Sequence, residues 1–210
     1  MSPRPDVSEE RKDQILEAAT KVFTQHGFVD ARMDDIVFES GLSKGALYWY
    51  FDSKDAIIVS ILDRVFDWEA AHWHEVLDRE DSAQKKLEAF VETSLKDLNK
   101  MEPLMPIFFD FWSLSVRNKT INKAIKRYYQ SFIEMVEPII ELGIEQGEFR
   151  PVNVRETALA IGALFEGTIL FYVYFTDIMD LETQFRTGLD LIMKGLVSTD
   201  LVSKQLKNGT

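Results

Sequence analysis

The sequence contains no cysteine, and no stretch of its 210 residues alternates apolar and polar residues in the manner of a strand. Without cysteine, the chain can form neither disulfides nor thiolate metal sites. Without strand periodicity or an internal repeat, a β-sheet or solenoid architecture has no support. The first residues also lack the apolar run of a secretory signal, so we expect a cytoplasmic protein.

Positive charge is scarce as well. The chain has 24 Lys and Arg against 35 Asp and Glu, which gives a net charge of -11. Residues 1–55 alone carry seven basic and eleven acidic residues. Sequence-independent coating of nucleic acid needs a broad basic surface, so the net charge argues against this function. Specific binding through a few cations on one face stays open, with few phosphate contacts.

Apolar residues recur at helical spacing along nearly the whole chain. This period predicts an all-α fold of about nine helices, with Gly27, Gly41 and Gly147 ending three of them. The expected helices cover residues 9–26, 33–40, 44–51, 54–77, 82–99, 104–116, 120–146, 154–175 and 181–196.

One apolar run is long enough to span a bilayer. It extends from Ala158 to Thr176 and has Glu166 at its middle. An ionisable group is costly at the centre of a membrane. We therefore expect no membrane insertion, and predict a helix buried on most sides in a protein core or a subunit interface.

Residues 33–40 and 44–51 form the most informative pattern. Two short helices joined by a three-residue turn that contains glycine are the helix-turn-helix layout, whose second helix fits the major groove of DNA. That second helix carries more exposed aromatic residues than its small core can bury. The alternative is a helical hairpin that only packs.

The segment from Arg11 to Ala56 resembles the DNA-binding domain of the TetR family of transcriptional regulators nearly end to end. The matching residues are Ile15, Leu16, Ala18, Ala19, Phe23, Gly27, Phe28, Gly41, Ser43, Gly45, Leu47, Tyr48, Phe51, Ser53 and Lys54. The resemblance implies that Lys44, Gly45, Ala46 and Trp49 face bases, and that Tyr48, Tyr50 and Lys54 face phosphates. Arg32, Met33 and Ser43 complete the expected DNA-binding set.

The segment also departs from the family in three places. Arg32 stands where the family usually has a capping Ser or Thr, Val37 where it has Ala, and Ala46 where it often has Thr. Arg32 could still hold a phosphate. Loss of the cap should weaken the start of the second helix by roughly 1 kcal/mol.

Two further patterns suggest enzyme or metal chemistry. Gly41 to Gly45 spell G-x-S-x-G, the nucleophile elbow of α/β hydrolases, but no strand precedes Ser43. Glu69, His72 and Glu75 share one helical row, which we interpret as a solvated helix face. We expect no enzyme, no cofactor and no metal site, and keep a serine hydrolase using Ser43 as a remote alternative.

The second half offers a set of aromatic residues, methionines and one carboxylate suited to a small lipophilic effector. These are Met101, Met105, Phe108, Phe109, Trp112, Tyr128, Phe132, Met135, Phe165 and Glu166. Plain core packing is the alternative for each of them. No Lys or Arg occurs in residues 101–115 or 156–184, so these two segments favour a cation over an anion unless Arg117, Lys123, Lys126 or Arg127 reaches the ligand. Glu166 and Asp110 lie within apolar runs, where one of them could meet a cation or bond to a neighbouring helix. Alternatively, Glu166 lies at the dimer interface and has no role in ligand binding.

The last two helices combine small residues with apolar area, and the resemblance implies that they pair with their copies in a homodimer. The expected interface comprises Leu159, Gly162, Ala163, Gly167, Leu170, Leu189, Ile192, Met193 and Leu196. We therefore predict a DNA-binding domain in residues 1–55 and an effector-binding and dimerisation domain in residues 56–210. The predicted protein is a repressor that leaves a palindromic operator when its effector binds. An activator or a ligand-independent regulator is the alternative.

Overall fold

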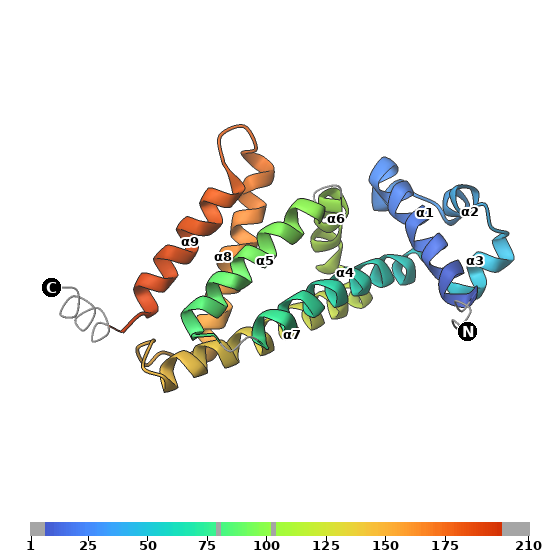
Figure 1. Cartoon of the computed structure of the whole chain (residues 1–210). Coiled ribbons are helices and arrows are strands. Elements are labelled where there is room, and N and C mark those ends of the chain that lie inside the picture. The colour runs from blue at the N-terminus through green and yellow to red at the C-terminus, as the bar shows by residue number, and fades with distance from the viewer. Residues whose placement is uncertain (1–6, 79–80, 102–103, 199–210) are drawn as a thin grey trace. The chain divides into compact units, whose positions relative to one another are not determined.

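The computed structural model describes residues 7–78, 81–101 and 104–198, and these residues form nine helices (Figure 1). Within these ranges the extended backbone pairs only in an isolated antiparallel bridge between Phe149 and Val197. The predicted all-α class is confirmed. The helices are α1 (Val7–Asp30), α2 (Met33–Ser40), α3 (Lys44–Tyr50), α4 (Lys54–Leu77), α5 (Ala83–Met101), α6 (Met105–Ser115), α7 (Lys119–Glu145), α8 (Val154–Tyr174) and α9 (Leu181–Leu196).

The described residues group into two compact units. The first contains the chain up to Trp68 and the segment from Lys100 to Arg127. The second contains Glu69 to Asn99 and the chain from Tyr128 onward. Helices α4 and α7 each contribute to both units. The functional division at residue 55 stays a prediction.

In the first unit, α1 packs against α2 and α6. The apolar face expected on α1 is buried, with Ile15, Ala19 and Phe23 in the core. Gly27 interrupts the helix with a positive φ of 71°, a conformation that favours glycine, before a last turn reaches Asp30. The predicted end of the helix at residue 26 therefore marks a break in α1.

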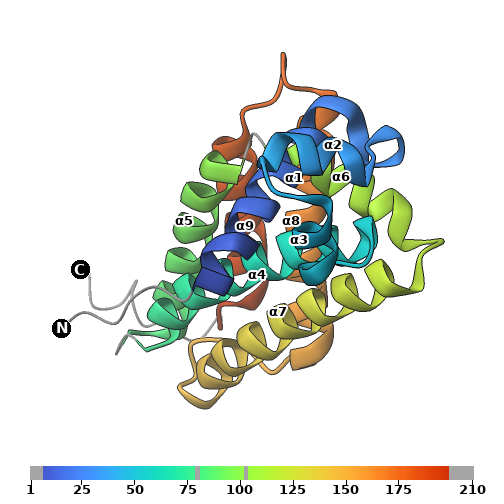
Figure 2. The same cartoon turned by 90° about the vertical axis from the view of Figure 1, so that its right-hand side faces the viewer.

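The second unit has an aromatic core to which five helices contribute. Trp73 of α4 contacts Phe90 of α5 and Phe132 of α7 at centroid distances of 5.4 and 6.0 Å. Phe165 of α8 lies 5.2 Å from Phe90 and 4.7 Å from Phe185 of α9. Such ring pairs add to the stabilisation from burial alone. Helices α8 and α9 pack against each other, as the rotated view also shows (Figure 2).

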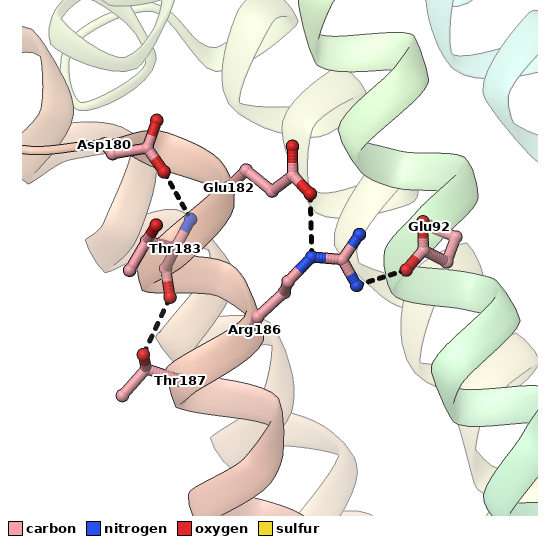
Figure 3. Close-up of polar contacts among 6 residues, drawn as sticks. All are labelled: Glu92, Asp180, Glu182, Thr183, Arg186 and Thr187. Atoms are coloured by element: carbon pink, nitrogen blue, oxygen red, sulfur yellow. Dashed lines mark hydrogen bonds and ion pairs between the residues drawn. The ribbon is translucent and has the colours of Figure 1, made fainter.

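Polar contacts fix the start of α9 (Figure 3). The Asp180 carboxylate accepts a hydrogen bond from the Thr183 backbone N–H at 2.8 Å, which caps the helix. Arg186 then donates to Glu182 on its own helix and to Glu92 on α5. The side chain of Arg186 therefore ties α9 to α5.

The apolar helix α8 is less buried than expected. By length and composition it could cross a membrane, yet only 11% of its most apolar window is buried within the chain. Of its residues, only Ala158, Ile161 and Phe165 are buried. The expectation of a helix buried in the core of this chain is wrong, whereas the alternative of burial in a subunit interface stays a prediction.

Candidate DNA-binding surface and effector cavity

Backbone capping builds the helix-turn-helix from α2 and α3. The Arg32 N–H donates to the Asp35 carboxylate at 2.8 Å, so Asp35 supplies a contact at the helix start where the expected hydroxyl cap is missing. Gly41 ends α2 in the left-handed conformation. The Ser43 hydroxyl accepts from the Ala46 N–H at 3.1 Å and so caps α3. The G-x-S-x-G pattern thus lies between two helices, without the strand that a nucleophile elbow requires.

Helix α3 buries Leu47 and presents its other face outward. Trp49 is 84% exposed, and Tyr48 and Lys44 are exposed beside it. The Lys44 ammonium lies 2.7 Å from the Asp34 carboxylate, whose hydrogen bond raises the pKa of Lys44. Both side chains are exposed, so this ion pair is weak and an approaching phosphate or base can replace it.

Phe38 of α2 is 88% exposed, and the sequence reasoning did not identify it. Phe38 follows the buried Ile36 by two residues and therefore lies on a different face of α2. This spacing indicates its exposure. Of the other predicted DNA-binding residues, Arg32, Ser43 and Gly45 are exposed, and Met33, Ala46 and Tyr50 are half-buried.

Lys54 has a different environment from the one expected of a phosphate ligand. Its ammonium donates to the carbonyls of Phe28, Val29 and Ala31 at 2.7, 3.0 and 2.6 Å, at the C-terminal end of α1. It also lies 4.8 Å from the centre of the Phe28 ring. An ammonium has three hydrogens to donate, and three carbonyls take them. The structure thus gives Lys54 a role in joining α1 to α4, and its phosphate contact stays a prediction.

Asp110 of α6 is bound to the end of α1. Its carboxylate accepts from the Phe28 backbone N–H at 2.9 Å, directly after the break at Gly27. Of the two roles considered for Asp110, a bond to a neighbouring helix is the one that the structure shows. This contact fixes α6 to α1 within the first unit.

The second unit contains a small cavity of about 40 Å³ surrounded by aromatic rings. Trp73, Phe90, Tyr128, Phe132 and Phe165 contribute aromatic rings to its wall. The remaining lining residues are Glu69, Ser94, Leu98, Tyr129, Gly162, Glu166 and Ile169, so neither Lys nor Arg is among the described residues that line the cavity.

Two carboxyl groups line this cavity. Burial raises the pKa of Glu166 to about 7, while a hydrogen bond with Tyr129 opposes the shift. Burial likewise raises the pKa of Glu69 to about 8, against a hydrogen bond with Tyr128. Glu69 is only 7% exposed, so its interpretation as part of a solvated helix face was wrong. The signal was present, because Glu69 continues the apolar row of Leu62 and Val65 at helical spacing.

Comparisons with known proteins agree with this architecture. Residues 15–61 match the family described as bacterial regulatory proteins, tetR family, and residues 64–198 match the C-terminal region of QacR-like proteins. The regulator YfiR of Bacillus subtilis, described as an uncharacterized HTH-type transcriptional regulator, is 31% identical over 158 residues, which cover 73% of this chain and 77% of YfiR. The chain belongs to the TetR family of transcriptional regulators.

Two solved structures share the fold. FadR from Bacillus subtilis, in complex with stearoyl-CoA, has a TM-score of 0.75 at 20% identity over 87% of this chain and 98% of its own. A transcriptional regulator from Saccharomonospora viridis, described as putative and in complex with choline, has a TM-score of 0.75 at 24% identity over 90% and 99% of the two chains. Their ligands are chemically unlike each other, so the TetR fold alone does not identify the effector.

The structure brings together part of the effector set expected for this TetR-family chain. Tyr128, Phe132, Phe165 and Glu166 line the cavity, and Met135 is buried in the same unit. The other five lie in the first unit. There, Phe108 contacts Phe66, Phe109 contacts Trp112, and Met101 lines a separate groove with α1 and α4 residues. Met105 is half-buried. A role in effector binding stays a prediction for all ten.

The residues expected at the dimer interface differ in exposure. Leu159, Ala163 and Leu170 are exposed, and Gly162, Gly167, Leu189 and Ile192 are half-buried, whereas Met193 and Leu196 are buried within the chain. Ala163 and Gly167 line an open groove of about 510 Å³ together with Phe171, Phe175 and Ile178. Those three exposed apolar residues were not in the sequence-based set.

Proposed function

We propose that this TetR-family regulator is a ligand-responsive repressor that binds a palindromic operator as a homodimer and leaves it when a lipophilic cation binds. The exposed face of α3 supports operator binding, because Lys44, Tyr48 and Trp49 are free of core packing. Lys44 can reach guanine or phosphate, Tyr48 can reach phosphate, and Trp49 can reach a thymine methyl. A symmetric dimer presents two such helices to two half-sites.

The occupant that we propose for the apolar groove on α8 and α9 is a second copy of this chain. Phe171 is 59% exposed there, and Ile178 is also exposed. Ala163 has only a methyl side chain and Gly167 has none, so a helix can approach closely at these positions. An apolar patch of this kind on a soluble regulator favours a protein interface.

The cavity is the observation that carries the effector proposal. Glu69 and Glu166 line it beside aromatic rings, and the described part of the chain contributes neither Lys nor Arg to its lining. Aromatic faces and carboxylates both attract cations, whereas an anion would meet no opposite charge. We propose Glu166 as the counter-ion of the effector.

The size of the cavity implies a change of conformation. A volume of about 40 Å³ is well below the roughly 300–1,000 Å³ typical of ligand pockets. The effector therefore binds a conformation in which the cavity is larger, and it releases DNA only if it prefers that conformation. Glu69 directly follows Trp68 on α4, and α4 continues into the unit that holds the helix-turn-helix. Movement of α4 is the proposed route of transmission.

The test begins with a selection from random duplexes, which should enrich one palindrome. Operator release and thermal shift are then measured with matched cationic, neutral and anionic lipophiles. Cations should release DNA, and Glu166→Gln should weaken them. Release by anions alone would contradict the proposed charge, and release by no lipophile would indicate a ligand-independent regulator. A reporter gene that rises when the protein is present would identify an activator.

A further inference from the structure

The wall of the effector cavity contains three buried polar atoms for which the described residues provide no hydrogen-bond partner. They are Oε2 of Glu69, Nε1 of Trp73 and Oγ of Ser94. All three side chains are more than nine-tenths buried and line the cavity. Buried polar atoms are rarely left unsatisfied, because each loses its hydration without gaining a partner.

Nε1 of Trp73 carries a hydrogen-bond donor, whereas the other two atoms are oxygens whose chemistry indicates what would satisfy them. Glu69 and Ser94 each offer an oxygen that accepts a hydrogen bond, and they come from neighbouring helices, α4 and α5. A protonated amine carries both a positive charge and N–H donors. A quaternary ammonium ion has the charge but no N–H, so it would leave both oxygens without a partner.

We propose that Glu69 and Ser94 form a subsite for the N–H groups of the effector, so that the cavity selects protonated amines over quaternary ammonium ions of the same shape. The proposal rests on the cationic effector proposed above and adds the class of cation. Glu166 supplies charge attraction to either kind of ion, whereas the subsite distinguishes them.

Binding at this subsite also moves a proton. Burial, with the charges of Asp97 and Glu166 adding to it, raises the pKa of Glu69 to about 8. The groups around Glu69 are Asp97 on α5, Tyr128 and Tyr129 on α7, and Glu166 on α8. The Asp97 carboxylate in turn lies 3.9 Å from Nδ1 of His72. In the free protein at neutral pH, Glu69 therefore holds a proton. An ammonium group beside Glu69 favours the carboxylate, so the proton leaves to solvent while the ammonium keeps all of its own.

The experiment compares an N,N-dimethylalkylamine, protonated at neutral pH, with its N-methylated quaternary counterpart by calorimetry. The wild type should prefer the amine by about tenfold or more, the effect of one hydrogen bond to a charged group. Glu69→Leu removes both carboxyl oxygens and should weaken binding of the amine more than binding of the quaternary ion, so most of the preference is lost. Glu69→Gln removes the charge but retains an acceptor oxygen, so it should weaken both ions and keep part of the preference. Ser94→Ala should reduce the preference by a smaller factor and serves if Glu69→Leu fails to fold.

Proton release gives a second readout, measured as the dependence of the binding heat on the ionisation enthalpy of the buffer. With the amine at neutral pH, the wild type should release more protons than Glu69→Gln, and amine affinity should rise from pH 6 towards pH 8. Equal loss of both ligands in Glu69→Leu, or no preference in the wild type, would overturn the subsite while leaving the cationic effector intact. If neither cation binds the wild type, the cationic effector fails and the subsite fails with it.

Discussion

At the scale of single residues, Lys54 shows how one side chain can connect two helices. Lys54→Met removes the three hydrogen bonds to the end of α1. The free energy of unfolding should fall by about 1–3 kcal/mol, since the site is partly solvated. Urea unfolding measures this change. If Lys54 contacts phosphate, the variant should instead reduce the slope of log operator affinity against log salt concentration by about one unit. We expect that reduction for the control Lys44→Met.

The buried carboxyls give the stability of the protein a pH dependence. The folded chain holds protons on Glu69 and Glu166 up to pKa values of about 8 and about 7, whereas an unfolded chain releases them near its ordinary pKa of about 4.3. The folded state thus binds more protons in this window, so stability falls as pH rises from about 5 to 8. Thermal unfolding across this range should show the decline, and Glu69→Gln should flatten it. An unchanged slope in that variant would contradict the assignment.

The two carboxyls also show what a sequence can indicate at this scale. Glu166 stands out because its neighbours are apolar, so it was predicted as a candidate. Glu69 lies among Asp67, His72 and Glu75 and looks like a surface residue. The spacing from Leu62 and Val65 indicates its burial, but its hydrogen-bond partner Tyr128 lies 59 residues later. Local periodicity does not reveal a partner at that separation.

At the scale of elements, α3 should carry the sequence specificity. Trp49→Ala removes an exposed side chain, so the fold should keep its stability. Operator affinity should fall by about 1–3 kcal/mol if Trp49 touches a thymine methyl or a base edge. Binding to operator and to random duplex is compared by fluorescence anisotropy. An equal loss on both duplexes would show that Trp49 contacts only the backbone of DNA.

The contact between α6 and α1 can be tested in the same way. Asp110→Ala leaves the Phe28 N–H without its acceptor and should lower the free energy of unfolding by about 1–2 kcal/mol. Hydrogen exchange at the Phe28 amide should become faster. Asp110→Asn retains an acceptor oxygen and is the matched control. If the two variants exchange equally fast, the Asp110 bond does not protect this amide.

Most element boundaries could be predicted because caps are local. Gly41 ends α2, and Ser43 and Ser53 cap the starts of α3 and α4, each with the expected geometry or bond. The continuation of α1 past Gly27 could not be predicted, because its last turn is held by Asp110 and Lys54 from other helices. The effector set failed to gather in one place for a similar reason, since spacing along the chain does not say which unit a helix joins.

At the scale of the whole molecule, dimerisation is the main expectation that a single chain leaves for experiment. Phe171→Glu places a charge in the proposed interface and should give monomers, because burying an unpaired carboxylate is costly. Val116, at the end of α6, is an apolar residue that is more exposed than Phe171, and Val116→Glu should leave the dimer intact. Sedimentation at micromolar concentration distinguishes the two. A wild type that sediments as a monomer would contradict the interface.

The unit that holds the helix-turn-helix is discontinuous in sequence, because it also includes the segment from Lys100 to Arg127. Within that unit, Asp110 binds Phe28, Asn118 binds Asp55 and Arg127 binds Asp63. If two such regulators were recombined at a single point near residue 68, the hybrid would therefore combine the helix-turn-helix of one parent with the α6 of the other. Exchange of specificity between such regulators, in evolution or in the laboratory, should succeed more often when both segments are transferred together.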